Sequence, residues 1–66
     1  MSKERVYEYL KKERERIQVH KVMRQCGLSR AEAIEILEEL KSKGYIAGNA
    51  REGYWLTREG WLKIKS

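Results

Sequence analysis

The sequence predicts a small α+β domain that is mainly helical, with a β-hairpin near its carboxyl end. Apolar residues recur at helical spacing up to Gly44, and beyond that residue the period changes from 3.6 to 2. There is no proline to interrupt the helical segments. We expect one domain over residues 1–66, because a chain of this length can enclose only a single modest core.

The first helix is expected to run from Ser2, a candidate N-cap, to about Lys12. Val6, Tyr9 and Leu10 share one face of this helix, at spacings of three and four residues. The run of mixed charge that follows is expected to be a solvated helix end and a turn.

An extended piece and a short second helix come next. Ile17 and Val19 alternate around a polar residue, which is typical of a very short strand. The second helix is expected over about residues 19–25, and Gly27 suits the left-handed backbone position just past its end.

The third helix has the clearest signal. Ser29-Arg30-Ala31-Glu32 is a capping box, in which serine and glutamate side chains satisfy each other's exposed backbone N–H groups. Apolar residues then follow at helical spacing to about Lys43, and they are Ala33, Ile36, Leu37 and Leu40.

Two short strands are expected after Gly44, over residues 45–47 and 53–57, joined by the turn-forming residues 48–52. Thr57 is a candidate N-cap for a last helix from Arg58 to about Lys65.

Five pieces of the sequence stand in a particular order: Ile17-Gln18-Val19, Cys26-Gly27-Leu28-Ser29, Leu37 with Leu40, Lys43-Gly44-Tyr45-Ile46 and Tyr54-Trp55-Leu56-Thr57-Arg58-Glu59-Gly60. Together they resemble the winged helix-turn-helix family, common among small bacterial and archaeal transcription regulators. The resemblance implies a three-helix core, a two-stranded wing and a short C-terminal helix. It also implies a DNA-binding transcription regulator whose recognition helix is the one at 29–43 and whose wing spans 45–57. The core would combine Ile17, Val22, Leu28, Leu37, Leu40, Ile46 and Leu56.

By this resemblance, the start and the outer face of the recognition helix reach double-stranded DNA. The matching positions are Ser29, Arg30, Glu32, Ala33 or Ile34, Glu35 and Glu38. Arg51, in the expected hairpin loop, is placed for a backbone or minor-groove contact. Basic residues nearer the amino end are further candidates for phosphate contacts, namely Lys12, Arg14, Arg16, Lys21 and Arg24.

The charge distribution qualifies this expectation. The net charge is +5, from fifteen Lys and Arg against ten Glu. Residues 1–28 hold eight basic and four acidic residues, whereas residues 29–44 hold three basic and four acidic. Glutamates repel phosphates, so the recognition helix is a poor conventional reader of the major groove.

Several interpretations therefore stay open. The outer face of the third helix could be formed by Ser29, Arg30 and Ile34, with the glutamates turned aside. Alternatively, the domain uses another surface, as a protein–protein module of replication, helicase or transcription machinery, or, less strongly indicated, binds RNA. The basic amino-terminal half could equally be a solvated face whose charges are paired with its own glutamates.

The aromatic residues near the hairpin divide by strand alternation. Tyr54 is expected in packing, as is Trp61, while Trp55 points to the opposite face and could stack on a base or fill an interface. Leu62 and Ile64 would extend such an interface in a homodimer or against a protein partner.

Catalysis, a metal site and a cofactor are not expected. Cys26 and His20 are the only residues of their kinds, and aspartate is absent. Neither a signal-peptide core nor an apolar run of about 18 residues is present, so we expect a cytoplasmic, nucleoid-associated protein with no membrane contact. The Lys/Glu/Arg-rich composition is thermophile-like, in keeping with an archaeal source.

Overall fold

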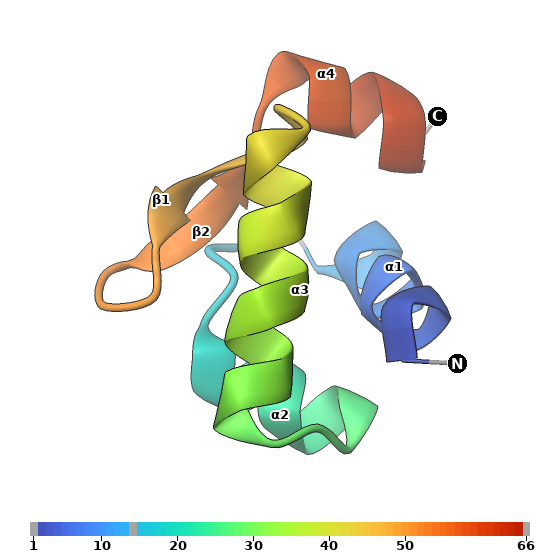
Figure 1. The fold of residues 1–66 in the computed structure, drawn as a ribbon. Coiled ribbons are helices and arrows are strands. Elements are labelled where there is room, and N and C mark those ends of the chain that lie inside the picture. Colours follow the sequence, from blue (N-terminus) through green and yellow to red (C-terminus); the bar gives the residue numbers. More distant parts are fainter. Residues whose placement is uncertain (1, 14, 66) are drawn as a thin grey trace.

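The computed structural model describes residues 2–13 and 15–65 and shows a mainly helical fold with a two-stranded antiparallel hairpin. The elements are α1 (Ser2–Lys12), α2 (Val19–Cys26), α3 (Arg30–Ser42), β1 (Ile46–Asn49), β2 (Gly53–Leu56), α4 (Arg58–Gly60) and a π-helical segment, η1 (Trp61–Lys65). In Figure 1, α3 crosses the middle of the molecule, the hairpin projects to one side, and α1 lies on the other. None of the helices in the described ranges is long and apolar enough to span a membrane.

The expected elements are present, with differences at their ends. α1 begins at Ser2, whose side chain is outside the described residues, so its expected N-cap role cannot be placed. β1 begins at Ile46 rather than Tyr45, because the Tyr45 N–H still completes the end of α3 by donating to the Leu40 carbonyl at 3.1 Å. β1 also extends to Asn49, so the hairpin turn is shorter than expected and covers residues 50–52.

The turn between α2 and α3 forms as its residues predict. Gly27 has φ 67° and ψ 40°, the left-handed conformation that glycine adopts without a steric penalty. Ser29 then caps α3: its hydroxyl accepts from the Glu32 N–H at 3.2 Å, and its own N–H donates to the Glu32 carboxylate at 3.0 Å. Hydrogen bonds from the Ser29 N–H and from the Ser29 side chain lower the pKa of Glu32, because they favour its ionised carboxylate.

The core lies where the three helices meet the hairpin. Val6 and Leu10 of α1, Leu37 of α3 and Tyr54 of β2 are fully buried. The expected extended piece is also present, since Ile17 and Tyr54 exchange backbone hydrogen bonds of 2.7 and 2.8 Å. Two residues expected in the core, Leu28 and Leu56, are only half-buried at its edge.

The carboxyl-terminal helix departs from one expectation. Thr57 caps it as predicted, with its hydroxyl accepting from the Gly60 N–H at 3.1 Å. Trp61, which was expected in packing, is 56% exposed, while Ile64 takes the buried position with 5% exposure. Strand alternation does not apply here, because Trp61 and Ile64 lie on the π-helical segment η1, whose buried residue is Ile64.

Candidate nucleic-acid interface

The start of α3 presents an exposed cation beside a helix amino terminus. Arg30 is the first residue of the helix, is exposed, and forms no ion pair within the described part of the chain. The Ser29 hydroxyl accepts the capping hydrogen bond from the Glu32 N–H. Unpaired backbone N–H groups and the helix dipole also favour anions at this end. Arginine and helix end therefore suit phosphate.

Three of the four α3 glutamates are engaged within the protein. Glu32 belongs to the capping box, and Glu38 accepts a 2.7 Å hydrogen bond from the Tyr54 hydroxyl. Glu39 pairs with Lys3 of α1 at 2.5 Å and with Lys43 at 3.7 Å. The Lys3 ammonium lowers the pKa of Glu39, and the carboxylate raises that of Lys3. Cations therefore offset the charge of Glu39, whereas Glu32 and Glu38 are held by neutral donors and keep their charge.

The other expected α3 contacts are altered by packing. Of the two alternative contact residues, Ala33 and Ile34, Ala33 is fully buried and cannot reach a ligand. Ile34 is half-buried against the core and exposes only part of its side chain. Glu35 and Glu38 remain on the exposed side of the helix. The glutamates are therefore not all turned aside, and the useful cationic surface is at the helix start.

The exposed side of α2 adds two more cations. Lys21 and Arg24 are three positions apart, which places them on neighbouring parts of one helix face. Both are exposed, and neither is paired with a carboxylate in the residues that the structure describes. α2 packs directly against α3, and in Figure 1 it lies at the same end of the molecule as the start of α3.

The hairpin carries a cation stacked on an aromatic ring. The Ile17–Tyr54 bridge places Arg16 opposite Trp55, and the guanidinium lies 5.4 Å from the centre of the indole ring. Arg16 also donates to the Glu52 carbonyl at 3.2 Å, which holds it against the hairpin. Trp55 remains 45% exposed, as strand alternation predicted. The pair forms a flat cationic surface on the hairpin.

The hairpin turn displays Arg51. This residue is exposed and without a carboxylate partner in the described ranges. The turn is ordered by the Asn49 side chain, whose amide oxygen accepts from the Glu52 N–H at 2.7 Å. In Figure 1 the turn is the part of the hairpin furthest from the helices.

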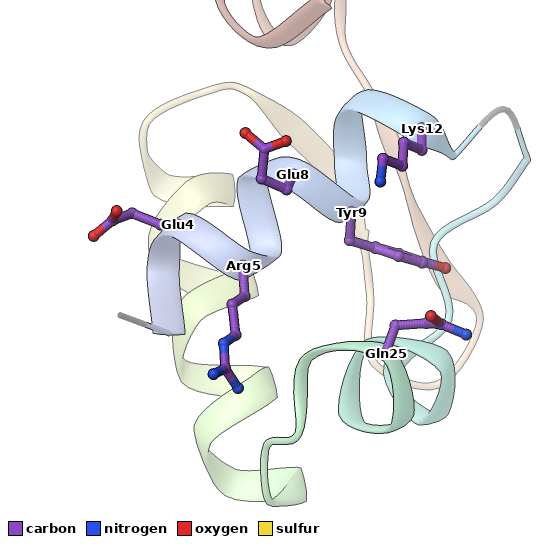
Figure 2. Close-up of a pocket in the computed structure, with 6 residues that line it drawn as sticks. All are labelled: Glu4, Arg5, Glu8, Tyr9, Lys12 and Gln25. Carbon is purple, nitrogen blue, oxygen red and sulfur yellow. The ribbon is translucent and has the colours of Figure 1, made fainter.

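The remaining basic candidates are placed differently. Lys12 lines a hollow between α1 and α2, where Glu4 and Glu8 also contribute (Figure 2). Its setting is therefore of mixed charge, unlike that of Arg30 or Arg51. Arg14 lies outside the described residues.

The three interaction candidates do not form one surface. Trp55 and Leu62 are exposed, at 45% and 63%, but they lie on different elements, β2 and η1. The expectation for Ile64 is wrong, because this residue is part of the hydrophobic core. Trp61, by contrast, was expected inside and is exposed next to Leu62, with the Lys65 ammonium 4.6 Å from its ring centre.

Two relationships were not predicted from the sequence. The Arg16–Trp55 stack could have been inferred, because pairing Ile17 with Tyr54 in an antiparallel register places their neighbours opposite each other. The Tyr54–Glu38 hydrogen bond has no such local signal, because it joins a strand to a helix 16 positions away.

No His, Cys, Asp or Glu residues gather in threes to hold a metal within the ranges described. Comparison with known proteins found no matching protein family, no similar curated protein and no similar solved structure.

Proposed function

We propose that the protein is a winged-helix DNA-binding protein, acting as a transcription regulator on double-stranded DNA. The supporting observation is the contrast between partnered acids and available cations. Three α3 glutamates have partners inside the protein. By contrast, four exposed cations have no carboxylate partner among the described residues, and they are Arg30, Lys21, Arg24 and Arg51. Available cations are what phosphate contacts need, and each one engaged releases counterions from DNA.

The approach to DNA is end-on. Exposed carboxylates at Glu35 and Glu38 disfavour laying the whole length of α3 into a groove, because phosphates line both of its edges. Docking by the start of α3 instead brings Arg30 to the major groove. Lys21 and Arg24 of α2 then face one backbone, and Arg51 reaches the flanking backbone or minor groove. Such a protein would work in the cytoplasm at the nucleoid.

The test is fluorescence anisotropy with a labelled random-sequence duplex at two salt concentrations. We expect micromolar binding that weakens steeply with salt, by about 0.9 in log K per log[salt] for each phosphate contact. Arg30→Ala and Arg51→Ala should each weaken binding several-fold. Arg58→Ala is the matched control, since Arg58 is exposed at the opposite end of the molecule, on α4.

Two results would overturn the proposal. One is a lack of binding even at low salt. The other is an equal loss in Arg58→Ala, which would show that only the net charge matters.

A second candidate function is protein–protein interaction through the carboxyl-terminal helix. Trp61 and Leu62 are adjacent, large and more than half exposed, which favours an interface with a protein partner or a second copy of the chain. Sedimentation of the native protein and of Trp61→Ala over a range of concentrations tests self-association. If the native protein stays monomeric up to millimolar concentration, the homodimer hypothesis is excluded.

A further inference from the structure

A second hollow, of about 430 Å³, lies where α1, the connection from α3 to β1, and η1 come together. Its lining residues are Tyr7, Lys11, Lys43, Tyr45, Lys63 and Ile64. It shares no residue with the cationic surface assigned to DNA.

The charged residues that line the hollow, within the described part of the chain, are all lysines. They come from α1, from the end of α3 and from η1. Lys11 and Lys43 have only exposed ion pairs, at 3.3 Å to Glu8 and 3.7 Å to Glu39. Such exposed pairs are weak and easily exchanged for a better anion. The hollow of Figure 2 differs, because two glutamates accompany its Arg5 and Lys12.

The walls of the hollow are aromatic and held in place. Tyr7 and Tyr45 are half-buried, and Ile64 is a buried apolar residue at the same position. Tyr45 is fixed by its backbone: its N–H donates to Leu40 and its carbonyl accepts from the Thr57 N–H, both at 3.1 Å. Both tyrosines therefore line the hollow from half-buried positions, and the ordered backbone at Tyr45 reduces the cost of forming the site on binding.

We propose that this hollow binds a small phosphate ester that carries a planar ring, in other words a nucleotide. Lysine is a compact point charge that suits phosphate oxygens, and three lysines match a ligand with several negative charges better than a single carboxylate. The tyrosine rings offer flat faces to a base. The volume falls within the range of about 300–1,000 Å³ that is usual for small-ligand sites.

The test is a titration of the ¹⁵N-labelled full chain with ADP at low salt, followed by amide chemical shifts. We expect saturable shifts at Tyr7, Tyr45 and Lys63, with tighter binding of ADP than of adenosine or of inorganic phosphate. Lys63→Ala should weaken ADP binding at least about five-fold, because it removes an ammonium group that has no carboxylate partner in the described residues. Lys41→Ala is the matched control, because Lys41 is an exposed lysine on α3 that does not line the hollow and belongs to neither proposed binding surface.

Three outcomes would overturn the proposal. The first is an absence of saturable shifts around the hollow, and the second is an equal loss of affinity in Lys41→Ala. The third is inorganic phosphate binding as tightly as ADP, which would show that the base ring contributes nothing. Circular dichroism of Lys63→Ala checks that the fold is retained. The titration contains no DNA, so its result is independent of the proposed DNA-binding function.

Discussion

The phenol of Tyr54 in β2 donates a 2.7 Å hydrogen bond to the carboxylate of Glu38 in α3. The same tyrosine is fully buried and exchanges two backbone hydrogen bonds with Ile17, ahead of α2. One residue thus links the hairpin to α3 and to the segment that leads into α2. The position of the hairpin relative to α3, on which the proposed DNA surface depends, is set in part by this link.

Tyr54→Phe is expected to lower the free energy of unfolding by about 1–2 kcal/mol. Phenylalanine keeps the buried ring, so the decrease in stability measures the hydrogen bond from the hydroxyl to the charged Glu38 carboxylate. Urea unfolding followed by circular dichroism gives the value. Tyr45→Phe is the control, because the Tyr45 hydroxyl makes no hydrogen bond with the described residues. Equal losses in the two variants would contradict a specific role for the Tyr54 hydroxyl.

Gly60→Ala is expected to destabilise the fold by about 2–3 kcal/mol, although alanine is the better helix former. A methyl group at this position would collide with the Tyr45 backbone, at the carbonyl oxygen and carbon. Thermal and urea unfolding measure the effect. Gly44→Ala is the comparison: nothing lies within 4 Å of its added methyl, so only its φ of +83° opposes the change, at about 1–2 kcal/mol. A Gly60→Ala protein as stable as the native one would contradict the close approach.

Glu39→Gln is expected to lower the unfolding midpoint at pH 7 and to have no effect at pH 2. The Lys3 ammonium holds the pKa of Glu39 below its ordinary value of 4.5. A lowered pKa in the folded state adds stability above the unfolded pKa, and this is lost as the pH falls through the folded one. Thermal unfolding from pH 2 to 7 measures the difference. In Glu52→Gln, which removes an exposed carboxylate that forms no ion pair among the described residues, the same pH-dependent difference should be absent.

Cys26 is expected to react with a soluble thiol reagent more than about 100-fold more slowly in the folded protein than in the unfolded one. Its side chain is 1% exposed, so the reagent has little access to the sulfur. Burial also raises the pKa of the thiol, which reduces the fraction present as the reactive thiolate. Absorbance at pH 8, with and without denaturant, follows the reaction. Rapid labelling of the folded protein would show that the α1–α2 contact opens readily.

The helices, the α2–α3 turn and the hairpin could be predicted because their signals are local. The capping box of Ser29 and Glu32 acts over three residues, and Gly27 needs only its own φ to be left-handed. The spacing of apolar residues changes after Gly44, and this change likewise depends only on two neighbouring segments, the third helix and the hairpin. Even the exposure of Trp55 follows from alternation within one strand.

By itself, the sequence determined the order of elements, most of their ends and the uneven distribution of charge. Only the tertiary structure decided which charges keep a partner, that Ile64 rather than Trp61 is buried, and that three lysines share one hollow. The physical reason is the distance along the sequence over which each interaction acts. Capping, turn geometry and periodicity act within a few residues, whereas Lys3 and Glu39 meet across 36 positions, through the packing of α1 against the rest of the fold.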